Sequence, residues 1–267
     1  MRDFLAIGLI FIAYMGCSSP AKMEAKHVVK EYKPGLVVDL CIPSSSGVRS
    51  LVVFIDGGYW RSGNPKTFLP GLRKKLCDEG FVTASIGYGL GPKNSCMDQV
   101  LDIADALNWL KKNKATYGID DTQIGILGTS AGAHLGLMYA LGAGRNTTRA
   151  LIAYGAPTDL RDQMIFSKPE YVRDCIQNSK AEEVSPVFLV TRGTPKMLIV
   201  HGDADATIPI DQSRQLYKAL KKFNAQVEFE VYPGGNHNFL FEKNPRAEKV
   251  KGDMIQFFKE NLSPPSF

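Results

Sequence analysis

The chain has 267 residues, of which 44% are apolar and 22% charged, and this composition excludes a disordered, collagen-like or coiled-coil protein. Thirty-two basic and 27 acidic residues give a formal net charge of +5. The basic residues are scattered among acidic ones and form no aromatic-interleaved stripe, so we expect no nucleic-acid partner. The five cysteines include no CxxC pair, which argues against a zinc ribbon and leaves their pairing open.

The N-terminus has the features of an export signal. Arg2 precedes a run of twelve largely apolar residues, Phe4 to Met15, which is too short to cross a hydrocarbon core of roughly 30 Å but fits a signal peptide. The sequence Gly16-Cys17-Ser18-Ser19 then resembles a bacterial lipoprotein cleavage box, although Tyr14 stands where an aliphatic residue is usual. A buried N-terminal helix is the alternative.

We therefore expect residues 1–16 to be a signal peptide, 17–26 a linker and 27–267 the folded domain. Cys17 would carry the lipid, and the lipid anchor would be the protein's only contact with a membrane. The protein would then be a periplasmic or outer-membrane lipoprotein. If Cys17 is not modified, it would be a secreted protein or would keep its N-terminal segment as an uncleaved anchor.

Seven short apolar runs, rich in β-branched residues, predict strands. They are residues 36–40, 51–55, 81–86, 124–127, 150–154, 197–200 and 227–231. Most are apolar on both faces, as in parallel strands covered by helices on each side, whereas the first and last alternate as edge or antiparallel strands do. Amphipathic runs from Met97, from Ser213 to Phe223 and from Arg246 to Phe258 predict helices between or after them.

This alternation predicts an α/β fold, a doubly wound and mostly parallel sheet with helices on both faces, built as one domain. The longest stretch without clear periodicity runs from Pro157 to Thr194. Segments of this length are usually functional, so we expect a wall or small lid over a site rather than a large cap domain.

A candidate nucleophile lies between a predicted strand and a predicted helix. Gly128 to Gly132 reads Gly-Thr-Ser-Ala-Gly, follows the run 124–127 and precedes the apolar run 133–141. This G-x-S-x-G setting is typical of a sharp turn that raises the serine above the sheet at a helix N-terminus. Ser130 is therefore the predicted nucleophile.

A serine hydroxyl needs a base that takes its proton, and the chain has four histidines. His237 follows the last predicted strand on a Gly-rich loop that can reach over the sheet edge, and it is the predicted base. His27 falls in the N-terminal strand region, while His134 and His201 are interpreted as structural.

The acid that orients the histidine should follow a strand between Ser130 and His237. Asp203 and Asp205 both come immediately after the run 197–200, and spacing alone does not indicate which of them is the acid. The other one would cap its own loop.

Backbone donors for an oxyanion are expected after the run 51–55, where Gly57 and Gly58 allow close approach to a substrate. We predict the N–H groups of Gly58 and Tyr59, together with that of Ala131 beside the nucleophile. The alternative is a plain Gly-Gly turn.

Together these residues resemble a family of small α/β-hydrolase esterases, the group with bifunctional xylan deacetylases and feruloyl esterases, and more broadly hormone-sensitive-lipase-like and arylformamidase-like enzymes. The likeness includes the runs 128–132, 153–160, 200–209 and 233–239. It implies an α/β-hydrolase fold with Asp205 as the triad acid. The family usually has His-Gly-Gly in the oxyanion loop, and here Asp56 replaces that histidine.

We therefore expect a serine esterase that acts on small or aryl acyl esters, with carbohydrate as the alcohol suggested by the resemblance. No metal and no organic cofactor is expected. An amide hydrolase of the arylformamidase or exopeptidase type and a non-catalytic binding protein on the same scaffold are the alternatives. The sequence does not indicate the oligomeric state.

Overall fold

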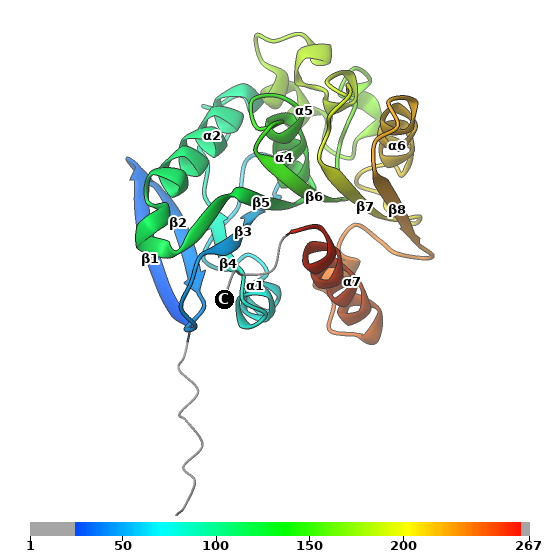
Figure 1. Cartoon of the computed structure of the whole chain (residues 1–267). Coiled ribbons are helices and arrows are strands. Elements are labelled where there is room, and N and C mark those ends of the chain that lie inside the picture. The colour runs from blue at the N-terminus through cyan, green and yellow to red at the C-terminus, as the bar shows by residue number, and fades with distance from the viewer. Residues whose placement is uncertain (1–24, 263–267) are drawn as a thin grey trace, which may run out of the picture.

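The computed structural model describes residues 25–262 and builds one sheet of eight strands (Figure 1). The strands are β1 (Lys26–Lys33), β2 (Leu36–Ile42), β3 (Arg49–Ile55), β4 (Val82–Ile86), β5 (Ile119–Thr129), β6 (Thr148–Tyr154), β7 (Lys196–Gly202) and β8 (Val227–Tyr232). Their order is β1-β2-β4-β3-β5-β6-β7-β8. The β1–β2 and β2–β4 pairs are antiparallel and every other pair is parallel.

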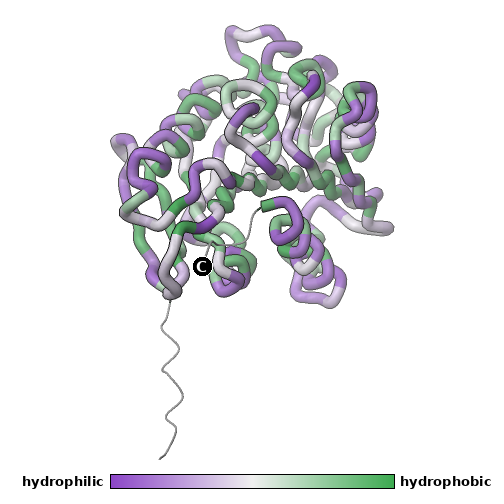
Figure 2. Tube along the Cα trace, in the orientation of Figure 1, coloured by the Kyte–Doolittle hydropathy of each residue, from purple (hydrophilic) through white to green (hydrophobic). Residues whose placement is uncertain are grey.

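Helices cover both faces of this sheet. They are α1 (Pro70–Asp78), α2 (Cys96–Lys112), α3 (Lys114–Tyr117), α4 (Ala131–Leu141), α5 (Pro169–Ile176), α6 (Asp211–Lys222) and α7 (Pro245–Asn261). Helices α1 and α7 lie on one face, and α2, α4 and α6 lie on the other (Figure 1). Each face has its own apolar cluster, and Figure 2 shows hydrophobic residues along the central strands with hydrophilic ones on the outer surfaces.

The predicted fold class is confirmed, and each of the seven predicted strands is present. Strand β1 is an eighth strand, whose side chains are mostly exposed, so that no apolar pattern marks it clearly. It begins at Lys26, one residue before the expected domain boundary. Strand β8 alternates because it is an edge strand, although it pairs in parallel with β7.

The segment from Pro157 to Thr194 contains more regular structure than its sequence suggested. It forms α5 and three short 3-10 turns, η1 (Gln163–Ile165), η2 (Ala181–Val184) and η3 (Pro186–Phe188). Helix α5 has only eight residues, too few for a clear periodic pattern, and it buries Val172, Cys175 and Ile176 on one side.

Two disulfides join elements that are distant in sequence. Cys41 of β2 is bonded to Cys77 of α1, and Cys96 of α2 is bonded to Cys175 of α5. All four residues are buried. Cys17 and the expected signal peptide lie outside the described residues. Within residues 25–262, no helix is both long and apolar enough to span a membrane.

Candidate active site

Ser130 occupies a strained turn between β5 and α4. Its backbone angles are φ 52° and ψ −122°, a conformation that costs a non-glycine residue on the order of 1–3 kcal/mol. Its N–H donates to the carbonyl oxygen of Tyr154 at 2.8 Å. Beside this turn the backbone of α4 touches the backbone at the end of β3. Only glycine fits at position 132, because a Cβ there would overlap the carbonyl oxygen of Ile55. The sequence-predicted turn is thus present, with the serine at its apex.

The structure brings His237 and Asp205 to Ser130. His237 Nε2 lies 3.0 Å from Ser130 Oγ, and His237 Nδ1 lies 2.6 Å from Asp205 Oδ2. A carboxylate can only accept a hydrogen bond, so Nδ1 carries the proton and Nε2 is free to accept from the serine hydroxyl. The imidazole is therefore in the tautomer that a general base requires.

Asp205 is held ionised although its side chain is only 2% exposed. Burial by itself raises the pKa of this carboxyl, but hydrogen bonds from His201 and His237, the charge interaction with His237 and the backbone N–H of Ile208 together lower it by more. Its Oδ1 accepts the backbone N–H groups of Thr207 and Ile208 at 2.8 and 2.9 Å. The net pKa of Asp205 lies well below its ordinary value, so the carboxylate stays charged beside the imidazole.

Asp203, the other candidate acid, does not face the imidazole. Its Oδ1 accepts the backbone N–H of Gly234 at 2.6 Å, in the loop that leads to His237. Its role in this arrangement is to brace that loop. Of the two candidates, Asp205 is therefore the one whose carboxylate faces the imidazole.

Tyr154 is a supporting residue that the sequence analysis missed. Its hydroxyl donates to the carbonyl oxygen of His237 at 2.9 Å and accepts the N–H of Leu240 at 3.2 Å. The next residue, Gly155, has φ 55°, and a Cβ there would lie 3.3 Å from His237 Cε1. The only sequence feature that could have indicated this role is a tyrosine directly before a glycine at the end of a core strand.

The two histidines interpreted as structural are fully buried and hydrogen-bonded. His134 Nε2 donates to the carbonyl oxygen of Val184 at 2.7 Å, while Nδ1 accepts from Trp60 Nε1 at 3.1 Å. Burial lowers the pKa of His134 to about 4, so it is neutral near pH 7. His201 Nε2 donates to the carbonyl oxygen of Ile208 and also lies 3.3 Å from Asp205 Oδ2, which makes it a neighbour of the site.

The Gly-Gly loop after β3 lies against the serine. A Cβ at Gly57 would lie 3.2 Å from Ser130 Cβ. Gly58, Tyr59 and Trp60 follow with φ values of 97°, 54° and 60°. We call residues 57–62 the oxyanion loop. Ala131, the third predicted donor residue, opens α4, where the first N–H groups have no acceptor within the helix.

Asp56, which replaces the family's usual histidine, directly precedes this loop and makes hydrogen bonds that hold it. Its Oδ2 accepts the N–H of Asn64 at 2.9 Å, and its carbonyl oxygen accepts from Tyr88 Oη at 2.9 Å. Burial raises the pKa of the Asp56 carboxyl, and the backbone N–H groups of Asn64 and Gly57 offset part of that effect. Asp56 therefore braces the loop through backbone hydrogen bonds.

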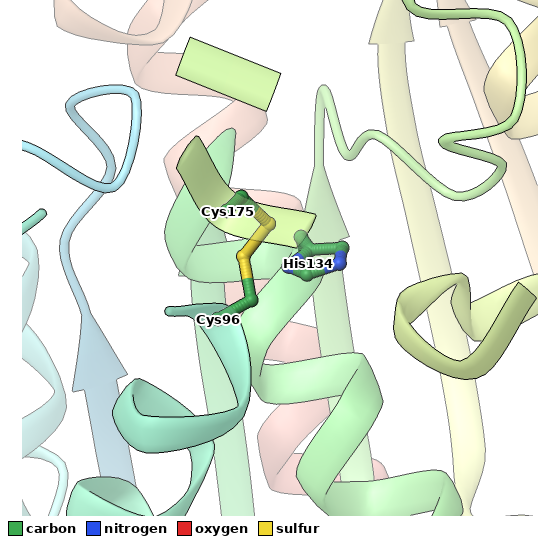
Figure 3. A group of neighbouring side chains, drawn as sticks. All are labelled: Cys96, His134 and Cys175. Carbon is green, nitrogen blue, oxygen red and sulfur yellow. A yellow bond between two sulfur atoms is a disulfide. The ribbon is translucent and has the colours of Figure 1, made fainter. Parts of the chain in front are cut away.

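One cluster in the described part of the chain has metal-ligating residue types, Cys96, His134 and Cys175. Figure 3 shows the two cysteines joined as a disulfide beside the imidazole. A disulfide offers no thiolate, and both ring nitrogens of His134 are engaged with Trp60 and Val184. The donor set therefore does not suit a metal ion in this state.

A serine, an imidazole and a carboxylate from three separate segments meet at the carboxyl edge of a mostly parallel sheet, and this combination defines an α/β-hydrolase with a Ser-His-Asp site. The sequence matches the BD-FAE family over residues 38–220. Because the match covers well over half of the chain, the protein belongs to the BD-FAE family.

The curated relatives of this chain include proteins named as esterases. The chain is 27% identical over 212 residues to esterase LipC of Mycobacterium tuberculosis, covering 71% of this chain and 53% of LipC. It is 27% identical over 282 residues to a probable isoprenylcysteine alpha-carbonyl methylesterase, ICMEL1 of Oryza sativa, covering 92% of this chain and 66% of that protein. The chain therefore spans between about half and two thirds of these curated relatives.

Solved structures similar to this one include esterase 2 of Thermogutta terrifontis. The form phosphonylated by sarin has a TM-score of 0.79 and 26% identity, and the match covers 92% of this chain and 98% of that one. The propionate-bound form has a TM-score of 0.77 and 27% identity, with the same coverage.

Two glycine substitutions test the backbone contact that holds the serine turn. We expect Gly132→Ala to lower the free energy of unfolding by about 1–3 kcal/mol, because the added Cβ overlaps the carbonyl oxygens of Ile55 and Asp56. Gly252→Ala in α7 adds a Cβ in open space and should raise stability by about 0.5–1 kcal/mol. Urea unfolding of both variants measures this, and equal effects would contradict the packing argument.

Proposed function

We propose that this protein is a serine carboxylic ester hydrolase that works through an acyl-enzyme. The observation that carries the proposal is the relay from Ser130 Oγ to His237 Nε2 at 3.0 Å and from His237 Nδ1 to Asp205 at 2.6 Å. The relatives and solved structures named as esterases support it.

In the acylation step, Ser130 Oγ attacks the ester carbonyl carbon while His237 Nε2 takes the hydroxyl proton. Asp205 stabilises the resulting imidazolium through Nδ1. The tetrahedral intermediate then collapses, the bond to the alcohol oxygen breaks, and the imidazolium returns its proton to that oxygen. The alcohol leaves, and the acyl group stays on Ser130.

Deacylation repeats these steps with water as the nucleophile. His237 takes a proton from water, the hydroxide attacks the acyl carbon, and Ser130 leaves with the proton from the imidazolium. Negative charge develops on the carbonyl oxygen in both steps. The backbone N–H groups of Gly58, Tyr59 and Ala131 are the proposed donors to it, and loss of one such donor typically costs about 10²–10³ in rate.

We propose short acyl groups as substrates, supported by the propionate- and butyrate-bound forms of the similar Thermogutta terrifontis esterase 2. A cleft of about 580 Å³ reaches Asp56 from the space between α1 and η4 (Phe239–Phe241). Apolar Phe68 and Phe241 and charged Glu242 and Lys243 line it. None of Ser130, His237 and Asp205 lines this cleft, so the proposal of a sugar as the alcohol rests on the family resemblance.

Export and lipid anchoring at Cys17 belong to the same proposal. Two intrachain disulfides support an oxidising compartment, because disulfides persist there and are rare in the cytosol. We expect the full chain expressed in a bacterium to incorporate labelled palmitate in the membrane fraction. Cys17→Ala should lose the label, and a labelled Cys17→Ala protein would contradict this assignment.

Fluorophosphonate labelling tests the nucleophile. We expect wild-type protein to be modified at Ser130 and to hydrolyse short p-nitrophenyl esters, whereas Ser130→Ala should show neither, since the attacking oxygen is gone. Folded wild-type protein that resists labelling would favour a binding protein on this scaffold. Faster turnover of N-formylkynurenine or an aminoacyl anilide than of esters would favour an amide hydrolase.

The two aspartates after β7 provide a matched pair. Asp205→Asn should lower kcat by about 10³–10⁴, because an amide that donates to Nδ1 stabilises the wrong imidazole tautomer. Asp203→Asn keeps an oxygen that accepts the N–H of Gly234, so we expect a change in kcat below about threefold. Steady-state kinetics on one p-nitrophenyl ester compares them, and the reverse ranking would reject Asp205 as the acid.

A further inference from the structure

The oxyanion loop requires support from outside itself. Tyr59 and Trp60 both have left-handed backbone conformations, with φ 54° and 60°, and two consecutive non-glycine residues keep such angles only where surrounding contacts hold them. Since Tyr59 also carries one of the proposed oxyanion donors, the same contacts determine where that N–H points.

Trp60 is held by the helices beneath the loop. Gln99 Nε2 of α2 donates to the carbonyl oxygen of Trp60 at 2.8 Å, and Trp60 Nε1 donates to His134 of α4 at 3.1 Å. Gln99 and His134 are both fully buried. These bonds fix one half of the loop to the main body of the fold.

Tyr59 and Arg61, on either side of Trp60, are held instead by α5. The ring of Tyr171 meets the ring of Tyr59 edge-on, with centroids 5.6 Å apart. The Arg61 guanidinium carbon lies 4.4 Å from the centre of the same Tyr171 ring, and Arg61 forms an ion pair with Asp174. One face of α5 therefore holds both neighbours of Trp60.

Helix α5 is short, and it is anchored by the three side chains that it buries and by one covalent bond. It has eight residues, and its N-cap residue, Lys168, makes no side-chain capping bond. Its covalent anchor is Cys175, one residue after Asp174, through the disulfide to Cys96 (Figure 3). Cys96 is the first residue of α2, whose N-terminus is fixed by a capping box between Ser95 and Asp98.

We propose that Arg61 is a positioning residue of the oxyanion loop, and that the Cys96–Cys175 disulfide holds α5 where Tyr171 and Asp174 can fix Arg61. The inference rests on the proposed esterase function. Because the loop's donors stabilise charge that develops only during reaction, loosening α5 lowers kcat and leaves KM nearly unchanged.

The two disulfides give a matched comparison. Cys96→Ala with Cys175→Ala removes the covalent bond that holds α5. Cys41→Ala with Cys77→Ala removes the bond between β2 and α1, and neither element supplies the contacts to Tyr59, Trp60 and Arg61 described above. On a p-nitrophenyl ester we expect the first pair to lower kcat by about tenfold with KM within about twofold, and the second to keep kcat within about twofold. Amide hydrogen exchange at residues 58–62 should quicken only in the first.

Variants of Arg61 and Asp174 test the inference if the protein without the Cys96–Cys175 disulfide fails to fold. Arg61→Ala should lower kcat by about five- to tenfold, and Arg61→Lys should recover part of that loss because it keeps the ion pair with Asp174. Asp174→Asn should lower kcat by about threefold.

This inference is overturned if the two disulfide variants have equal kcat, or if Arg61→Ala has the kcat of the wild type. Labelling of the wild type at Ser130 would still support the esterase function in that case. Wild-type protein that neither hydrolyses esters nor reacts with fluorophosphonate overturns the proposed function itself. The two failures are therefore distinguishable in one set of measurements.

Discussion

The site depends on one backbone constraint, the close contact of the start of α4 with the ends of β3 and β5. At Gly128 and Gly132 neighbouring backbone occupies the space that a side chain would need, and this contact forces Ser130 into a left-handed turn. The strain in that turn is offset by the packing of α4, whose residues from Ala131 to Leu141 are all buried. A serine in relaxed helix or strand geometry would not present its hydroxyl to the imidazole in this way.

The polar groups around this turn are held in place by hydrogen bonds to one another. Asp205 stays ionised in a buried position because two histidines and two backbone N–H groups surround it. Its charge fixes the tautomer of His237, while Tyr154 and Asp203 hold the loop that carries the imidazole. The geometry of the proposed active site therefore depends on several loops that brace one another.

The residues that sequence reasoning found are those with a local pattern. Ser130 stands in a strand-turn-helix motif, and His237 is the one histidine on a Gly-rich loop at the sheet edge. Asp203 and Asp205 follow the same strand, so spacing does not separate them. The resemblance implied Asp205, and the turn that bonds Asp205 to Thr207 and Ile208 places its carboxylate beside the imidazole. The Cys96–Cys175 pair spans 79 positions, and short, local patterns carry no information about such a contact.

A crystal structure of the phosphonylated protein tests the central claim most directly, because it records the nucleophile and the oxyanion donors at once. The account predicts phosphorus bonded to Ser130 Oγ, with the phosphonyl oxygen about 3 Å from the backbone nitrogens of Gly58, Tyr59 and Ala131. An adduct on another residue, or a phosphonyl oxygen turned away from those three nitrogens, would contradict it.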